Sequence, residues 1–358
     1  MDTSRRLLSA LALTAVLATS GCAVNELNRG EASGPLAGTL DGAGSSAQSA
    51  AQAAWIAGIQ DANGRLTVNY EPSGSGAGRE AFLAGGLDYA GSDSALTAEE
   101  AEAGLAACVP GSGAINLPLY ISPLAIIANI EGVDELNLDA ATTALIFRGE
   151  ITRWNDPRIQ ELNPDAALPN ATITAVHRSD ASGTTKNFTD YLAQAAPDEW
   201  GVDSADAFPY GGESAQGNSG VVNAVTNGQN TIGYADASRA GDLTIASLKV
   251  GDEFVAYTPE AAARVVEASP LEDGRADDDL AIVLDRTIEE PGTYPLVLVS
   301  YLIACRDYPN DADAELVRGF VEWIVSEEGQ ALAADYAGSA PLSPGLTDRV
   351  LAAIEGIR

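Results

Sequence analysis

The hydrophobic and polar positions of this chain follow two periods that replace each other in short blocks. The Ala-rich block 45–62 has helical spacing and ends at Asn63 and Gly64, which is typical of a helix terminus. The next block, Leu66 to Tyr70, alternates as a half-buried strand does. A Gly/Ser loop, a short helical block and another strand-like block follow. This order of strand, loop and helix predicts an α/β fold with mostly parallel sheets.

The remaining blocks continue the pattern as far as the C-terminus. Helices are expected at 79–84, 97–107, 136–147, 186–193, 219–227 and 314–327, and strands at 87–92, 173–176 and 231–235. Two apolar segments, Ile115 to Ile130 and Tyr294 to Ala304, are extended and unusually long. Segments of this kind can cross between two lobes, so we expect one lobe from 38–114 plus 298–358 and a second from 115–297. The hinges are expected near Ala114 to Pro118 and Tyr294 to Val299.

The first 21 residues have the features of a signal peptide. Arg5 and Arg6 precede the apolar run Leu7 to Ala18, which is too short to span a bilayer as a stable helix. The small residues before Cys22 resemble a lipobox of bacterial lipoproteins, although Thr19 stands where Leu is usual. We therefore expect Cys22 to be acylated and 22–37 to form a tether, with simple secretion as the alternative.

Composition limits the class of protein and the kind of partner. A chain of 358 residues can form two lobes, and 46% hydrophobic with 20% charged residues is ordinary for a globular protein. The net charge of −32 is not ordinary, and it argues against binding nucleic acid or anionic lipid. A small anion is still allowed, because screening acts over about 8 Å at physiological salt.

Two cysteines remain after Cys22. An exported protein meets an oxidising compartment, so Cys108 and Cys305 are expected to form a disulfide rather than two buried thiols. Neither cysteine has a neighbouring cysteine or histidine at a spacing that indicates a metal site.

A candidate oxyanion cradle lies at 178–185. Arg178 can donate two parallel hydrogen bonds, Asp180 is close enough to hold it, and Ser182 to Thr185 open a helix. The loops 42–46 and 73–78 also precede helices, so three helix N-termini could meet at one anion. Taken singly, each loop is more often an ordinary turn or helix cap.

Asp93 follows a strand, and its carboxylate could distinguish one kind of bound anion from another. An ionised carboxylate only accepts hydrogen bonds, so next to a bound oxyanion it selects one that carries a proton. Phosphate has such a proton at neutral pH and sulfate does not. The alternative is that Asp93 caps the turn leading to the helix near Thr97.

Several segments, in this order and spacing, resemble the phosphate-specific substrate-binding proteins of bacterial ABC uptake systems. They are GAGSSA (42–47), YEPSGSGAG (70–78), LDYAGSD (87–93), FRGEITRWNDPRIQELNP (147–164), HRSDASGTTKNF (177–188), GNSG (217–220), TIGYAD (231–236) and PLSPGL (341–346). The resemblance runs from about residue 38 to the end. It implies a two-lobed periplasmic-binding-protein fold that closes over one dehydrated phosphate.

The resemblance also implies a ligand set. The expected contacts are Ser46, the Ala47 backbone, Ser75, Asp93, Arg178, Ser182, Gly183 and Thr184, with Asp180 orienting Arg178. Ser46 and Ala47 replace the Thr-Phe of many members, which keeps a hydroxyl and an amide. Ala181 replaces a glycine and is tolerable only if its φ is negative.

The function implied is extracytoplasmic capture of inorganic phosphate by a lipid-anchored monomer that delivers it to an ABC permease. No cofactor, metal or nucleic acid is expected. One alternative is a binder of sulfate or molybdate on the same fold, and another is a sensor that has lost transport. A secreted phosphohydrolase is a third alternative, which would have to use the single histidine, His177, with Ser182.

Overall fold

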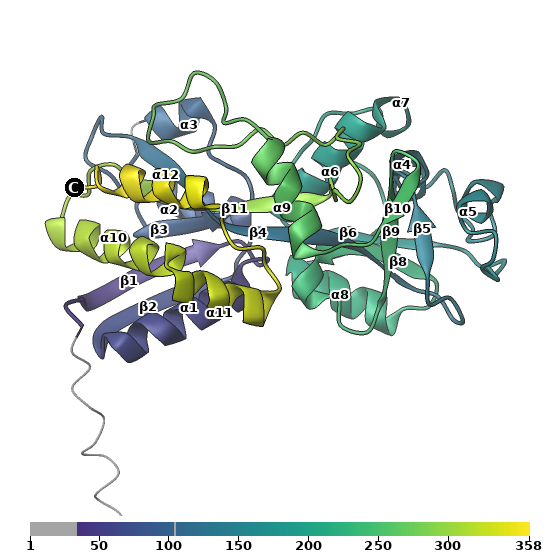
Figure 1. Cartoon of the computed structure of the whole chain (residues 1–358), viewed down its shortest axis with the longest axis horizontal. Coiled ribbons are helices and arrows are strands. Elements are labelled where there is room, and N and C mark those ends of the chain that lie inside the picture. Colours follow the sequence, from purple (N-terminus) through teal and green to yellow (C-terminus); the bar gives the residue numbers. More distant parts are fainter. Residues whose placement is uncertain (1–33, 104) are drawn as a thin grey trace, which may run out of the picture.

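One long strand, β4 (Ala114–Asn129), runs through both halves of the computed structural model, which describes residues 34–103 and 105–358 (Figure 1). Its first part, Ala114 to Pro123, pairs antiparallel with β11 (Val297–Cys305). Its second part, Leu124 to Asn129, pairs antiparallel with β8 (Thr231–Asp236). The strand order is therefore β2 (Arg65–Glu71), β1 (Ala37–Gly44), β3 (Tyr89–Ser92), β11, β4, β8, β6 (Thr174–Arg178) and β7 (Glu213–Ala215), and β4 joins two sheets into one.

The first lobe contains the N-terminal βα units and the C-terminal helices. Its elements are β1 (Ala37–Gly44), α1 (Ser49–Ala62), β2 (Arg65–Glu71), α2 (Ser75–Leu83), β3 (Tyr89–Ser92), α3 (Ala98–Glu102), α10 (Asp311–Val325), α11 (Glu327–Ala337) and α12 (Pro344–Ile354). Strands β2, β1 and β3 are parallel, and β11 pairs antiparallel with β3. The parallel strands place their following loops at one edge of the sheet.

The second lobe repeats this design with more short elements. They are β5 (Leu136–Leu138), α4 (Ala140–Phe147), α5 (Pro157–Leu162), β6 (Thr174–Arg178), α6 (Gly183–Ala195), α7 (Pro197–Trp200), β7 (Glu213–Ala215), α8 (Gly217–Asn227), η1 (Ala237–Arg239), β9 (Thr244–Val250), β10 (Glu253–Val255) and α9 (Pro259–Ala268). Strands β8, β6 and β7 are parallel. The predicted α/β two-lobed fold is confirmed, with sheets that are mixed rather than wholly parallel.

The core lies in the central strands. Every residue of β11 and all but the last of β4 are buried, because helices cover both faces of the sheet (Figure 1). A strand that is buried on both faces has an apolar sequence without alternation, which is why these two segments are recognisable in the sequence. Within the described part of the chain, none of the helices combines the length and the apolar character needed to span a bilayer.

The crossing between the lobes differs in place from the expected one. Ala114 to Pro118 pair with β11 inside the first lobe, and β4 changes partner between Pro123 and Leu124. The apolar sequence of β4 does not indicate where its pairing partner changes, because the residues before and after that point are equally buried. The corresponding point on the other crossing is Leu296, the residue just before β11, whose carbonyl accepts the Leu124 amide at 2.8 Å; it lies within the expected Tyr294 to Val299 segment.

Two secondary-structure expectations were wrong. The helix expected at 136–147 begins only at Ala140, because Leu136 to Leu138 form β5 beside β9 and Asp139 caps the helix. The helix expected at 97–107 is the short α3, since Ala103 is extended. The predicted signal peptide, Cys22 and most of the predicted tether lie in residues 1–33, outside the described residues.

Cys108 and Cys305 form the predicted disulfide. The bond joins the segment after α3 to the end of β11, across 197 positions of sequence, and both side chains are buried. A crosslink over so long a loop removes many conformations from the unfolded chain. The disulfide also ties the C-terminal part of the first lobe to the N-terminal part of the same lobe.

Replacing both cysteines by serine is expected to lower the free energy of unfolding by about 2–5 kcal/mol, because the unfolded chain regains its loop entropy. Urea unfolding of the parent protein and of the Cys108→Ser/Cys305→Ser variant measures this difference. Parent protein treated with a reductant serves as the control and should match the variant. Equal unfolding midpoints with and without reductant would contradict the expectation.

Candidate functional site

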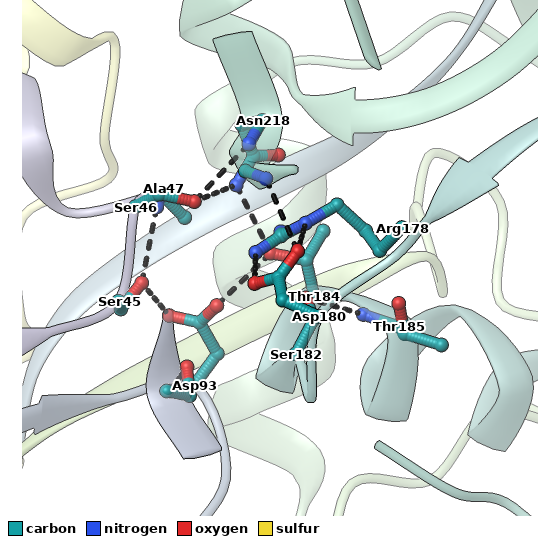
Figure 2. Close-up of polar contacts among 12 residues, drawn as sticks. Ser45, Ser46, Ala47, Asp93, Arg178, Asp180, Ser182, Thr184, Thr185 and Asn218 are labelled. Carbon is teal, nitrogen blue, oxygen red and sulfur yellow. Dashed lines mark hydrogen bonds and ion pairs between the residues drawn. The ribbon is translucent and has the colours of Figure 1, made fainter. Parts of the chain in front are cut away.

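The candidate site lies where the loops after five strands meet between the lobes. The first lobe contributes the loops after β1, β2 and β3, and the second contributes those after β6 and β7. Figure 2 shows residues of four of these loops gathered in one region, among them Ser46, Asp93, Arg178 and Asn218, with Asp93, Thr184 and Asn218 linked by hydrogen bonds. Parallel strands direct their carboxyl ends to one edge of a sheet, which is where α/β proteins bind their ligands.

Asp93 is the acceptor at the centre of this region. Its side chain is buried, and the residue is only 3% exposed. Oδ1 accepts hydrogen bonds from the Ser45 and Ser300 hydroxyls, the latter at 2.6 Å, and Oδ2 accepts one from Thr184 at 3.0 Å. Burial raises the pKa of Asp93, and these three hydrogen bonds with the nearby Arg178 charge only partly offset that effect.

Asp93 does not cap the helix that follows it. Thr97 caps α3, since its hydroxyl accepts the Glu100 amide and the Glu100 carboxylate accepts the Thr97 amide. The Asp93 carboxylate accepts from hydroxyls outside the turn, those of Ser45, Ser300 and Thr184, so the alternative interpretation of Asp93 as a turn cap is wrong.

Arg178 ends β6 and is the donor of the site. It is 2% exposed, and its Nε and Nη2 donate to the two oxygens of Asp180 at 2.8 and 2.5 Å. Burial acts to raise the pKa of Asp180, but the hydrogen bonds and charge of Arg178, with the Gly217 amide, outweigh it and hold the pKa below its ordinary value. Asp180 thus remains ionised and fixes the guanidinium.

One nitrogen of Arg178 is unsatisfied. Nη1 is buried and has no hydrogen-bond partner among the described residues. A buried donor without a partner is costly, and in a folded protein such a donor calls for an explanation. A negatively charged acceptor brought between the lobes would supply the partner.

The start of α6 lies directly against the first lobe. A Cβ on Gly183 would come within 2.7 Å of both the Asp93 Cβ and the Ser75 Oγ, so only glycine allows this approach. The Ser182 hydroxyl accepts the Thr185 amide at 3.2 Å and caps the helix. Among the described residues Asn230 is the non-glycine residue with positive φ, so Ala181 meets the condition set by its sequence.

Ser46 and Ser75 face partners inside the site. The Ser46 hydroxyl accepts the Asn218 amide at 3.1 Å and its side-chain Nδ2 at 3.0 Å, which joins α8 to the loop before α1. The Ser75 hydroxyl accepts the Asp93 amide at 3.1 Å. The Ala47 amide, expected to face the ligand, donates to the Ser45 hydroxyl at 3.1 Å.

The expected ligand contacts and Asp180 lie in this one region, and the three expected helix N-termini, of α1, α2 and α6, meet there. The N-terminus of α8 is a fourth. Sequence reasoning missed Ser45, Asn187, Asn218 and Ser300. A signal existed for Ser300, since it is the polar position in the apolar segment that forms β11.

His177 and Ser182 are engaged with other groups. His177 stacks on Phe208, with ring centroids 4.4 Å apart, and its Nδ1 lies 2.9 Å from the Arg178 carbonyl. Residues 34–103 and 105–358 contain no group of three or more His, Cys, Asp or Glu side chains arranged to hold a metal ion.

Comparisons with known proteins identify the family to which the chain belongs. The model of the PBP superfamily domain matches residues 29–328. The chain is 36% identical over 326 residues to phosphate-binding protein PstS 3 of Mycobacterium tuberculosis, which covers 89% of this chain and 86% of the relative. Phosphate-binding protein PstS of Xylella fastidiosa is 29% identical over 320 residues, covering 87% and 83%.

Solved structures agree on the fold. A phosphate-binding protein from Stenotrophomonas maltophilia has a TM-score of 0.67 at 20% identity, covering 88% of this chain and 94% of that one. A periplasmic phosphate-binding protein solved with phosphate has a TM-score of 0.69 at 21% identity, covering 88% and 93%. The chain thus belongs to the PBP superfamily and, within it, to the family of PstS phosphate-binding proteins.

Proposed function

We propose that this protein binds inorganic phosphate between its two lobes outside the cytoplasm and delivers it to an ABC-type permease. The observation that carries the proposal is the buried Nη1 of Arg178, a charged donor without a partner in residues 34–103 and 105–358, which shares the site with the carboxylate of Asp93. Such a pair suits an anion that both accepts and donates hydrogen bonds. The relatives named as phosphate-binding proteins support the same ligand.

The proposed ligand contacts are Ser46, the Ala47 backbone, Ser75, Asp93, Arg178, Ser182, Gly183 and the backbone amide of Thr184, whose hydroxyl donates to Asp93. The helix N-termini of α1, α2 and α6 add partial positive charge and backbone donors. Asp180 orients Arg178 and compensates part of its charge. Many donors and little water are what a buried tetrahedral anion requires.

Binders of other oxyanions and phosphohydrolases are less well supported. Sulfate at neutral pH has no proton to offer Asp93 and would meet its charge without compensation. A phosphohydrolase would need an activated nucleophile, but Ser182 and His177 have other partners. We therefore propose a binding protein without catalytic activity.

Replacing Arg178 by alanine is expected to weaken phosphate binding by about 2–3 kcal/mol or more, because a buried charge-assisted donor is lost. Calorimetric titration of the mature domain with phosphate measures the loss. The control is Arg153→Ala, since Arg153 contacts Asn170 on the surface of the second lobe. Unchanged affinity in the Arg178 variant would place the site elsewhere.

Titration of the parent protein with sulfate tests the choice of anion. At neutral pH phosphate is expected to bind far more tightly than sulfate, because Asp93 is a hydrogen-bond acceptor. Equal affinities for the two anions would refute the role of Asp93.

We propose that the lobes are held closed over the ligand by direct contacts between them. Arg79 of α2 forms an ion pair with Asp206 of the second lobe, and the Gly76 amide donates to the Ala181 carbonyl at 3.1 Å. Arg239 donates to Ser49 at the start of α1. Arg79 and Asp206 are 14% and 24% exposed, so solvent screens the pair only in part.

Asp206→Ala is expected to lower phosphate affinity roughly threefold to tenfold, because a half-buried ion pair of the closed state is lost. Titration calorimetry gives the affinity, and small-angle scattering with and without phosphate reports closure. Asp156→Ala removes the Arg158–Asp156 pair inside the second lobe and is the matched control. The same loss of affinity in both variants would exclude a specific role between the lobes.

We also propose that the mature chain is a monomer anchored to the membrane by an acylated Cys22. The sequence before this cysteine supports the proposal, which concerns residues outside the described part of the chain. A lipid anchor would keep the binding lobes beside the permease.

A further inference from the structure

Three hydroxyl groups surround the Asp93 carboxylate, and they come from distant parts of the chain. Ser45 precedes α1, Ser300 lies in the middle of β11, and Thr184 lies in the first turn of α6. Ser45 and Ser300 both contact Oδ1, whereas Thr184 contacts Oδ2. The first two belong to the lobe that carries Asp93, and the third belongs to the other lobe.

N–H groups that donate to the two serine hydroxyl oxygens determine which way the hydroxyl protons point. The Ser300 oxygen accepts Nε2 of Gln48 at 2.6 Å, and the Ser45 oxygen accepts the amides of Ala47 and Gln48 at 3.1 and 3.3 Å. A hydroxyl that accepts from an N–H group has its own single proton free to donate elsewhere. Both serine protons therefore go to Asp93.

The amide groups that impose this direction are themselves fixed. Nε2 of Gln48 also donates to the Tyr301 carbonyl at 3.1 Å, and a carbonyl can only accept. Oε1 of Gln48 accepts a hydrogen bond from Nε2 of Gln52 at 2.9 Å. For Thr184 the donor is Nδ2 of Asn218 at 3.2 Å. The Asn218 side chain is held by the Asp236 amide, which donates to its Oδ1 at 2.8 Å.

Counting acceptor positions on the carboxylate then distinguishes its two oxygens. A carboxylate offers about four lone-pair positions, two on each oxygen. Oδ1 uses both for Ser45 and Ser300, and Oδ2 uses one for Thr184. We infer that Ser45 and Ser300 are positioning residues: they occupy Oδ1, keep the carboxylate an acceptor and leave Oδ2 to accept the hydrogen bond of the protonated ligand, an inference that rests on the proposed binding of phosphate.

The burial of Asp93 and the charged groups near it make its ionised state depend on these hydroxyl donors. Burial raises its pKa, the Arg178 charge opposes the rise, and the buried Asp236 and Tyr70 lie close enough to interact with it electrostatically. Removing a hydroxyl donor raises the pKa of Asp93 further. A protonated Asp93 no longer accepts from phosphate and can instead donate to sulfate, so specificity becomes weaker as the pH falls.

The test compares Ser300→Ala and Ser45→Ala with the parent protein by titrating phosphate and sulfate from about pH 5 to about pH 8, a range that lies above the ordinary pKa of Asp. Each variant is expected to lose about tenfold or more in phosphate affinity at pH 7. As the pH is lowered, the affinity for sulfate relative to phosphate should rise in every protein. In the two variants this rise should begin at a higher pH than in the parent. Ser269→Ala is the matched control and should behave as the parent does, because the Ser269 hydroxyl at the end of α9 donates to the Val265 carbonyl at 2.7 Å and accepts the Asp285 amide at 3.1 Å.

Two results overturn the inference, and they are distinguishable. If both variants weaken phosphate and sulfate equally with an unchanged pH profile, the serines only fill space and the inference fails alone. If the folded parent protein does not bind phosphate, the proposed function fails and the inference fails with it. Thermal unfolding of each variant identifies any that does not fold, and the other variant then decides.

Discussion

The structure depends on holding two opposite charges, Asp93 and Arg178, in one buried region between the lobes. A buried charge is tolerated only when it is paired or fully hydrogen-bonded, and each of these groups is supported by its own set of partners. Asp93 has hydroxyl donors from both lobes, and Arg178 has Asp180. Because small hydroxyl and amide donors are found at strand ends and helix starts, the site requires several βα loops to meet. The two-lobed sheet, with β4 continuous through it, provides that meeting point.

The same arrangement explains how a chain with a net charge of −32 can bind an anion. Charges on the surface act through water and salt over about 8 Å, so they are weak at a buried site. Inside the site the field is set by Arg178, by the helix N-termini and by backbone amides. The acidity of the surface and the affinity of the site are therefore separate properties, and the surface charge is free to serve solubility.

Much of the fold and of the site could be predicted from the sequence, because the relevant signals are local. Apolar runs gave the central strands, and the Gly/Ser loops with Arg178 gave the cradle. The contacts that complete the site are not local: Ser300 and Asp93 are 207 positions apart, and Ser46 and Asn218 are 172 apart. The point where β4 changes partner could not be predicted either, since both of its sheets bury it in the same way.

In the proposed function, the two lobes divide the recognition of the ligand between them. Arg178 and the start of α6 belong to the second lobe and would attract any oxyanion. Asp93, with Ser45 and Ser300, belongs to the first lobe and would accept only from a protonated one. The lobes meet through Thr184 and through Asn187, whose side chain donates to the Asp93 carbonyl at 2.7 Å. In the proposed complex, an anion without a proton would therefore oppose the contacts that hold the lobes together. Discrimination would then be exerted on closure, when water has left the site and each unpaired charge costs most.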